Sequence, residues 1–320
     1  HYGTRRQRQM CIRDSYDHNM LVMSERVTDH LPKSEEFTPK QRLWYIRAKQ
    51  VVISSGSIER PIVFGNNDTP GVVLAAAAKE YMKVYGVLVG KKPIVFTNND
   101  SAYETAIEFK KNNINPIVLD SRQESNSEII KEAKSLGIDI KFSHVVVAAK
   151  GYKKVKSCDI AEISEDKQNL NQIKNIECDC ICVSGFWTPT IHLASQSGGK
   201  TKFKDEIDAF VPDKSKQKEV TLGSANGVFT LEETLKTSFD KGFELSKAIT
   251  NNNNSQQIPK VSEKKHSKHD KFWCVPLPKG KKYKRFLDFQ NDVAVSDIEL
   301  AIREGYRSIE HVKRYTTLAM

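Results

Sequence analysis

"PIVFTNNDSAYETAIEF", residues 93–109, is the stretch that decides the fold of this chain. Its apolar start, PIVF, predicts a short buried strand, and SAYETAIEFKK predicts the helix that follows it. A second apolar run, PIVLD, ends in Asp120, about 20 residues further on, where a dinucleotide-binding unit places its ribose-binding acid. The turn between strand and helix is TNND, residues 97–100, and contains no glycine. The sequence therefore keeps the frame of a phosphate-binding unit and fills its turn with side chains.

The filled turn argues against ordinary dinucleotide binding at residues 97–100. A pyrophosphate needs bare backbone N–H groups at a helix N-terminus, and glycines that let it approach. Asp100 would place a carboxylate where the phosphate sits, and Ser101 with Glu104 predicts a capping box that uses the free N–H groups. We therefore expect a self-capped turn. Asp120 then loses its ribose role and is interpreted as a surface acid.

The segment around this turn predicts an α/β fold. Strands and helices alternate with short connections, which is typical of a parallel sheet. The predicted elements are, in order, a strand at 93–96, a helix at 101–112, a strand at 116–119, a helix at 126–136 and a strand at 138–147. Two further patterns predict a strand of a small antiparallel sheet in RLWYIR and one more buried strand in CDCICVSG.

Two small-residue turns are the better candidates for a nucleotide site. VVISSGSIERP, residues 51–61, is a core strand that ends in Ser54, Ser55 and Gly56. Such a turn lets the backbone lie close to a cofactor, although a tight structural turn would use the same residues. GSANG, residues 223–227, is a second glycine turn, and the long amphipathic helix after it would offer its positive end to an anion.

Composition places the chain among soluble globular proteins. Its 320 residues suffice for two domains, and 38% hydrophobic with 28% charged residues is the usual balance. No apolar run reaches the ~18 residues that a membrane helix needs. The six cysteines do not form the pattern of a disulfide framework, which favours a reducing cytoplasm.

The net charge of +10 is concentrated in two places. Residues 259–285 hold ten Lys or Arg and two acids, and residues 1–15 hold four Arg and one acid. Because no aromatic platform or groove-reading motif accompanies the basic residues, they favour a solvated linker over nucleic-acid binding. We interpret 251–282 as a basic disordered linker. Residues 1–15, including Cys11, resemble translated adapter sequence and are interpreted as non-native.

The remaining cysteines and histidines do not form a catalytic or metal-binding pattern. Cys178, Cys180 and Cys182 have a spacing that predicts one face of a strand, and buried packing is favoured over a zinc site. His192 has no Ser, Cys or paired acid at a supporting spacing. His266 and His269 fall in the predicted linker and are interpreted as solvated.

Several strings carry a resemblance to a known family. They are RLWYIRAKQVVISSGSIERPIVFGNNDTPGV, TNNDSAYETA, CVSGFWTPTIHLASQSGGK, AFVP and VAVSDIELAIREGYRSIEHVKRYTTLAM. Together they resemble the α subunit of heterotetrameric sarcosine oxidase, from about Tyr16 to Met320 with only the linker excepted. The resemblance implies a pyridine nucleotide reductase-like fold with two dinucleotide-binding domains. It assigns residues 16–90 and 176–250 to an NAD-binding domain, 91–175 to a second Rossmann-like domain, and 283–320 to a truncated small helical domain.

The same resemblance implies a function. The family's complex demethylates sarcosine oxidatively to glycine, yields hydrogen peroxide and passes the one-carbon unit to tetrahydrofolate, which binds a C-terminal domain of the α subunit. It implies a non-catalytic NAD in this chain, FAD on the β subunit, FMN near the α/β interface, and β, γ and δ partner subunits. The isolated chain is then expected to be inactive.

The chain departs from the family pattern at both ends. The first glycine fingerprint, which would precede Tyr16, is missing, and the chain stops at YTTLAM before a folate domain. We interpret the sequence as a fragment that binds NAD weakly by itself. Residues 283–320 also resemble small [2Fe–2S] domains that begin C-x-C. Asp288 and Gln290 stand at those places and cannot supply thiolates, so no cluster is expected.

Alignment to the family implies which residues contact the NAD. Ser224 stands where FAD-binding relatives place an Asp against the ribityl chain, which agrees with NAD rather than FAD. Ser224, Phe229 and Leu231 are the implied contacts, and Ser54, Ser55 and Gly56 are added from the nucleotide-edge turn.

Three other interpretations of the function stay open. The first is the α subunit of a related amine, proline or opine dehydrogenase, and the second is a non-enzymatic nucleotide-binding scaffold. The third is a stand-alone NAD-dependent reductase, which the blocked second fingerprint and the lack of a redox C-x-x-C disfavour.

Overall fold

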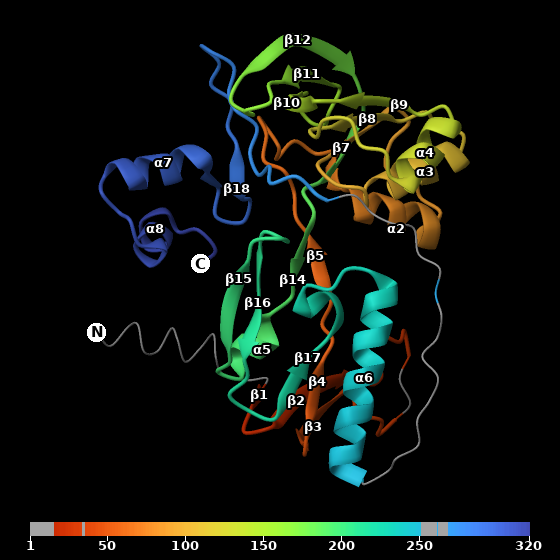
Figure 1. Cartoon of the computed structure of the whole chain (residues 1–320), viewed down its shortest axis with the longest axis vertical. Coiled ribbons are helices and arrows are strands. Elements are labelled where there is room, and N and C mark those ends of the chain that lie inside the picture. Colours follow the sequence, from red (N-terminus) through yellow and green to blue (C-terminus); the bar gives the residue numbers. More distant parts are fainter. Residues whose placement is uncertain (1–15, 34–35, 251–260, 262–267) are drawn as a thin grey trace. The chain divides into compact units, whose positions relative to one another are not determined.

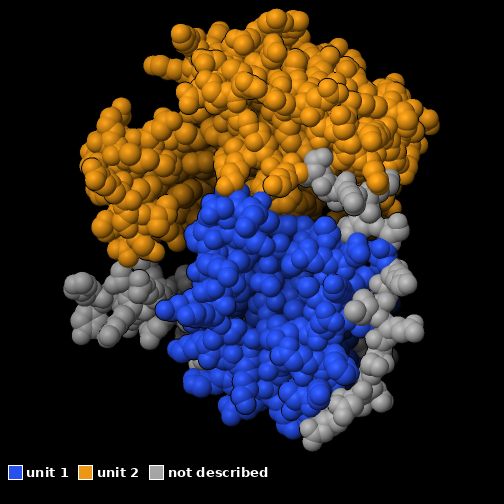
Figure 2. All heavy atoms as spheres, in the orientation of Figure 1, with its two compact units in different colours: residues 1–58, 188–263 blue, residues 59–187, 264–320 orange. Residues whose placement is uncertain are grey.

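The computed structural model describes residues 16–33, 36–250, 261 and 268–320 (Figure 1). The predictions for residues 1–15, for His266 and for most of 251–267 therefore lie outside the described residues. Contacts divide the chain into two compact units, drawn in separate colours in Figure 2. Unit 1 comprises residues 1–58 and 188–263, and unit 2 comprises residues 59–187 and 264–320.

Unit 2 is built on a five-stranded sheet in which every neighbouring pair is parallel. In spatial order the strands are β6 (Val72–Leu74), β13 (Cys180–Ser184), β7 (Pro93–Thr97), β8 (Ile117–Asp120) and β9 (Asp139–Phe142). All residues of β7 and β13 are buried, as expected for a parallel sheet covered on both faces. The predicted α/β class and parallel sheet are confirmed.

Helices cover one face of this sheet. In a second core cluster, residues of a small antiparallel sheet pack with Ile94, Phe96 and Leu119 of the parallel sheet. The helices are α2 (Ala75–Tyr85), α3 (Tyr103–Lys111) and α4 (Glu128–Ser135), and their buried residues share one cluster with Val95 and Val118. The antiparallel strands are β10 (His144–Lys150), β11 (Ser157–Ile163) and β12 (Leu170–Glu177). The single strand predicted over 138–147 is thus two strands, because the backbone turns at Ser143, whose φ is 52°.

The three clustered cysteines do not share one strand face as predicted. Cys180 and Cys182 pack with the helices, whereas Cys178 packs in the other core cluster with Cys158. The reason is that β13 begins only at Cys180, so Cys178 lies outside the strand alternation. All four thiols are buried and unoxidised.

Unit 1 contains the predicted antiparallel sheet and a parallel strand pair. The antiparallel strands are β1 (Tyr16–Asp17), β2 (Met20–Arg26) and β3 (Gln41–Arg47). The parallel pair is β4 (Val51–Ile53) with β17 (Glu219–Thr221), followed by the 3₁₀ turn η1 (Gly223–Asn226) and the long helix α6 (Leu231–Thr250). The other elements are α5 (His192–Gln196), β15 (Lys200–Lys204) and β16 (Ala209–Lys214). The chain passes between the units along β5 (Ser57–Glu59) and β14 (Trp187–Pro189).

Residues 268–275 belong to the packed part of unit 2, so the predicted linker 251–282 does not extend through them. Phe272 and Val275 are buried, and the backbone of Val63 exchanges hydrogen bonds with Trp273 and Val275 at 2.8 Å each. His269, predicted to be solvated, stacks on Phe186 with ring centroids 3.9 Å apart. We call residues 268–275 the strap.

The C-terminal part of unit 2 is small and partly helical. It consists of β18 (Phe286–Asp288), β19 (Val293–Ala294), α7 (Val295–Arg303) and α8 (Ile309–Thr316). Its buried apolar side chains are Phe286, Val293, Ala294, Ala301 and Val312.

Candidate functional site

The two small-residue turns of unit 1 leave the same edge of one strand pair. β4 and β17 run parallel in a register that pairs Ile53 with Thr221, and the Leu222 N–H donates to the Ile53 carbonyl at 2.9 Å. The turn at residues 54–56 and the turn at residues 223–227 therefore start side by side at the carboxyl ends of these strands. Open α/β sheets bind ligands at such an edge.

The turn at 54–56 leaves its backbone accessible. Gly56 has φ +78°, a conformation that favours glycine, and a Cβ added there would meet nothing within 4 Å. Ser54 and Ser55 are exposed. The turn is held in place because the Ser55 hydroxyl donates to the Thr190 carbonyl at 2.7 Å and the Thr190 N–H donates to the Gly56 carbonyl at 3.0 Å.

The turn at 223–227 needs both of its glycines. Gly223 and Gly227 have φ of +65° and +75°. A Cβ on Gly227 would also lie 2.7 Å from Ile207 and 2.9 Å from Val211, too close for any real contact. Gly227 is thus required by packing and by its backbone conformation, and Gly223 by its backbone conformation. The half-buried Ser224 follows Gly223 in this turn.

The helix after this turn is a poorer anion site than expected. Phe229 is half-buried and Leu231, the first residue of α6, is half-exposed. Glu232 and Glu233 lie in the first turn of α6 and already place negative charge at its positive end. The six predicted residues lie on two neighbouring connections of unit 1, and their contact with a nucleotide stays a prediction.

The TNND turn of unit 2 is closed by its own side chains. Residues 97–100 are all at most 2% exposed. The Thr97 hydroxyl donates to the Asn99 carbonyl at 2.9 Å and accepts from the Asn99 N–H at 3.0 Å. The Asn99 amide donates to the Ser184 hydroxyl at 3.1 Å. The backbone groups that would meet a pyrophosphate are therefore already used or covered.

The predicted capping box is wrong, although the turn is self-satisfied. Helix α3 begins at Tyr103, and no side chain caps it. The Ser101 hydroxyl donates instead to Asn99 Oδ1 at 2.6 Å, and Glu104 forms an ion pair with Lys79. The closing interactions therefore come from Asn99 and from other elements.

Asp120, predicted as a surface acid, is fully buried and anchors a charged cluster. Arg122 Nη2 lies 2.7 Å from Asp120 Oδ2, and Arg122 Nη1 lies 2.8 Å from Asp100 Oδ1. The Tyr103 hydroxyl donates to Asp120 at 2.8 Å. Burial alone would lower the pKa of Arg122, but its hydrogen bonds to Asp120 and the charges of both carboxylates raise it, so Arg122 stays protonated.

The strap covers the same turn from outside. The Asn98 side-chain amide donates to the Asp270 carbonyl at 2.8 Å, and the Asp270 N–H donates to the Asn98 carbonyl at 3.0 Å. Arg122 also donates to the Lys268 carbonyl at 3.3 Å. The chain's own backbone thus contacts the turn where a nucleotide would approach, and these residues do not fit a dinucleotide.

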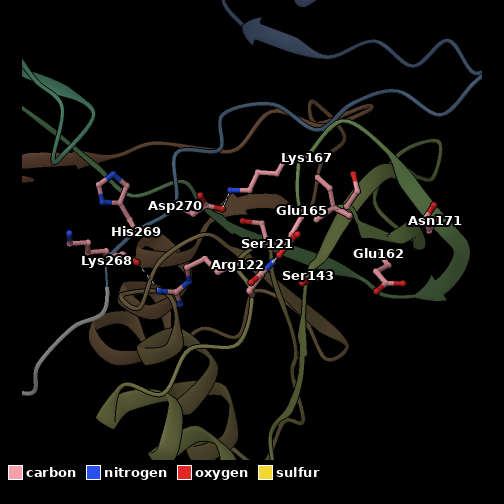
Figure 3. A pocket seen from close by; sticks show the side chains of 13 residues that line it. Ser121, Arg122, Ser143, Glu162, Glu165, Lys167, Asn171, Lys268, His269 and Asp270 are labelled. Atoms are coloured by element: carbon pink, nitrogen blue, oxygen red, sulfur yellow. Dashed lines mark hydrogen bonds and ion pairs between the residues drawn. The ribbon is translucent and has the colours of Figure 1, made fainter.

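A cavity of about 680 Å³ lies beside the strap, within unit 2 (Figure 3). All but one of its lining residues are polar or charged in type: Ser121, Arg122, Gln123, Ser143, Glu162, Ile163, Ser164, Glu165, Lys167, Asn171, Lys268, His269 and Asp270. The cavity could not be predicted from the sequence because its lining comes from several short segments that share no pattern.

The described part of the chain has neither a cluster of metal ligands nor a membrane-spanning helix. No group of three or more His, Cys, Asp or Glu is arranged to hold a metal ion there. Within the same residues, every helix is too short or too polar to cross a membrane.

Comparison with known proteins finds relatives along most of the chain. Residues 282–320 match the family described as Sarcosine oxidase A3 domain. Over 312 residues, 95% of the chain, it is 34% identical to sarcosine oxidase subunit alpha of Corynebacterium sp. strain P-1 and 33% identical to that of Rhizobium meliloti strain 1021. The chain is a homologue of the sarcosine oxidase α subunit. It spans 32% and 30% of the lengths of these two relatives.

Solved structures agree on the fold of this α-subunit homologue. The L-proline dehydrogenase from P. horikoshii matches with a TM-score of 0.51 at 20% identity, over 94% of this chain and 53% of that chain. A variant of the flavoprotein disulfide reductase RclA from Escherichia coli matches with a TM-score of 0.50 at 14% identity, over 76% and 50%. The fold is thus an α/β fold that resembles those of a proline dehydrogenase and a flavoprotein disulfide reductase.

In the A3 region of the α-subunit homologue, Asp288 acts as a hydrogen-bond acceptor. It accepts from the Gln290 N–H at 2.9 Å and from the Ala319 N–H at 2.8 Å. A hydrogen bond from the Asn291 side chain, followed by that from Ala319, holds its pKa below the usual value. The places of the C-x-C thiolates therefore do not fit an iron–sulfur cluster.

Proposed function

We propose that this chain is part of the α subunit of a multi-subunit sarcosine oxidase, and that unit 1 binds a non-catalytic NAD. The observation that carries the proposal is the 34% identity to a sarcosine oxidase α subunit, which extends over 95% of the chain and so through both units. In the complex, sarcosine is demethylated oxidatively to glycine with release of hydrogen peroxide, and the one-carbon unit passes to tetrahydrofolate. Partner subunits β, γ and δ complete the assembly.

The accessible turns of unit 1 support the placement of the NAD. Gly56 leaves open space beside its backbone, and Ser54 and Ser55 are exposed next to it. Ser224 can donate or accept through its hydroxyl from the neighbouring turn. In this role the residues bind and orient the nucleotide.

The closed turn of unit 2 supports a scaffolding role for that unit. Its nucleotide edge is occupied by the side chains of residues 97–100 and by the strap. NAD bound in unit 1 would add binding energy to the folded state, whereas the redox chemistry belongs to FAD and FMN, mainly on the β subunit.

Hydrogen peroxide formation tests whether the redox chemistry belongs to the β subunit rather than to this chain. The chain is assayed alone, and the full-length α subunit is assayed with and without the β subunit, each with sarcosine, dimethylglycine and proline. We expect no peroxide from the chain alone and peroxide from sarcosine when the α and β subunits are together. Peroxide from the chain alone would contradict the assignment of the redox chemistry to the β subunit. Turnover of proline only would favour the related proline dehydrogenase.

A further inference from the structure

We propose that α2 and the loop after it form a docking surface for an amphipathic helix of a partner subunit. We call it the α2 surface, and it comprises Ala77, Tyr81, Val84, Tyr85, Val87 and Leu88. The inference rests on the proposed function, because it takes this helix from one of the β, γ and δ subunits. It concerns unit 2 alone and does not depend on NAD binding.

The composition of α2 is the first argument for an occupant. Its sequence, AAAAKEYMKVY, has only three charged residues. One apolar stripe of the helix is buried in unit 2 and consists of Ala75, Ala78 and Met82. Outside that stripe, Tyr81, Val84 and Tyr85 are 47%, 66% and 65% exposed. A helix that is apolar well beyond its buried stripe is typical of one that is covered on a second side.

The α2 surface continues past the end of the helix. Gly86 ends α2 in the left-handed conformation, with φ 63°, and the Val87 N–H donates to the Tyr81 carbonyl at 2.9 Å. This hydrogen bond keeps Val87 beside the last turn of α2, and both Val87 and Leu88 are exposed. Contiguous apolar patches on a protein surface mark sites of interaction with other proteins.

The shape of the α2 surface suits a second helix. Ala77, Tyr81 and Tyr85 are four residues apart, and such a row forms one ridge of a helix-packing surface. The centroids of the two tyrosine rings lie 5.9 Å apart. Together with Ala77 and Glu80, these rings line a hollow of about 320 Å³, which can receive a large apolar side chain of the second helix. Tyrosines at the centre and charged residues around them are the usual composition of a protein–protein interface.

The charges around the α2 surface set the chemistry of the partner helix. Three neighbouring lysines are already paired with acids of unit 2, as Lys79 with Glu104, Lys83 with Glu108, and Lys92 with Glu177. The Lys91 side chain has no ion pair among the described residues, but it lines a separate hollow beside Ile117. Glu80 lines the hollow of the α2 surface, is exposed, and forms no ion pair within the described part of the chain. The partner helix should therefore place a lysine or arginine against Glu80.

The sequence between the described parts of the chain does not fit this role. Residues 251–267 hold only two large apolar residues, Ile258 and Val261. A helix that packs along a ridge needs apolar residues that recur every three or four positions. These residues are thus excluded as the occupant, and a helix of a partner subunit is the occupant that fits the proposed assembly.

Assembly of the full-length α subunit with the β, γ and δ subunits tests the α2 surface. Analytical ultracentrifugation measures the concentration at which the subunits assemble. Tyr85→Ser should raise this concentration about tenfold or more, the usual effect of removing an aromatic anchor from an interface. Glu80→Lys should raise it as well, because a like charge would then face the basic residue of the partner. Tyr152→Ser is the matched control and should leave assembly unchanged, since Tyr152 is an exposed tyrosine of unit 2 outside the α2 surface.

Thermal unfolding of the α subunit by itself separates a partner's helix from other occupants. Tyr85→Ser should leave the melting temperature of the free α subunit unchanged, because the ring is exposed there. A lower melting temperature would overturn the inference, since another part of the α subunit would then cover the surface. Loss of a self-association of the α subunit in Tyr85→Ser would also overturn it, since the occupant would then be a second copy.

The assembly experiment also distinguishes failure of this inference from failure of the proposed function. If the unaltered α subunit does not assemble with the β, γ and δ subunits, the proposed function fails and the inference fails with it. If the unaltered subunit, Tyr85→Ser and Glu80→Lys all assemble equally well, the inference alone is overturned.

Discussion

Arg122 Nη1 lies 2.8 Å from Asp100 Oδ1. Arg122, which follows β8, therefore neutralises the acid in the turn that follows the neighbouring strand β7. The same guanidinium holds Asp120, at the position where a ribose-binding acid would stand. The edge at which a dinucleotide would bind thus holds a buried ion cluster. Unit 2 has the frame of a nucleotide-binding unit, and side chains occupy the turn where glycines would stand.

Removal of Arg122 should strongly destabilise unit 2. Arg122→Ala leaves Asp100 and Asp120 buried without a counter-charge, and breaking a buried ion pair in this way costs about 3–5 kcal/mol. Urea denaturation measures the free energy of unfolding. Lys79→Ala, which breaks the more exposed pair with Glu104, is the matched control and should cost less than about 1 kcal/mol. Equal losses in the two variants would contradict the importance of the buried cluster.

Asn98 should hold the strap against the sheet. Asn98→Ala removes the donor to the Asp270 carbonyl at 2.8 Å and should cost about 1–3 kcal/mol. Hydrogen exchange measured by mass spectrometry should be faster in residues 268–275 of Asn98→Ala than in the same residues of the unaltered chain, and this increase should be larger than the increase in α4. Asn112→Ala is the control, because that side chain donates at the surface to the Glu108 carbonyl. Unchanged exchange of the strap in Asn98→Ala would show that other contacts hold it.

Glu59 should make the stability of unit 2 depend on pH. Its carboxylate accepts from the Ala76 N–H at 2.7 Å, in the first turn of α2, but burial raises its pKa above the usual 4.5. The folded state then binds the proton more tightly than the unfolded state, so this contribution is fully present below pH 4.5 and is lost as the pH rises through the raised pKa. Glu59→Gln keeps an acceptor oxygen without the charge.

Urea denaturation of both proteins across this pH range isolates the contribution of Glu59. Relative to the unaltered chain, Glu59→Gln should gain stability as the pH rises. If the difference in unfolding free energy between the two proteins is constant with pH, or changes in the opposite direction, burial does not raise the pKa of Glu59.

Two glycines of unit 1 should respond differently to a methyl group. Gly227→Ala meets Ile207 and Val211 and also strains the backbone, so it should unfold unit 1 in part. Gly56→Ala has open space and should cost only the backbone strain, about 1–2 kcal/mol. Circular dichroism and thermal melting compare the variants. A larger loss for Gly56→Ala would mean that the turn at 54–56 is packed rather than open.

The sequence predicted β7, α3, β8, α4 and β13 of unit 2 because each depends on a local pattern. The apolar run before TNND and the period of the helix after it lie within about 20 residues. The capping of α2 by Glu59 spans 17 residues, and the contact of Asn98 with Asp270 spans 172. Contacts at such separations leave no periodic signal, which is why the strap was predicted as a linker and Asp120 as a surface acid. The two glycine turns of unit 1 were predictable, since glycine at positive φ is a local requirement.

The location of the nucleotide is the central claim, and NMR titration of the chain with NAD tests it most directly. Backbone amide shifts can be followed at NAD concentrations high enough to detect weak binding. We predict shift changes at residues 54–56 and 223–229, with none at residues 97–100. The same titration of Gly56→Ala should give smaller changes, because the added methyl group obstructs the approach to the backbone. Shift changes centred on residues 97–100 and Asp120, or no changes in either unit, would contradict the account.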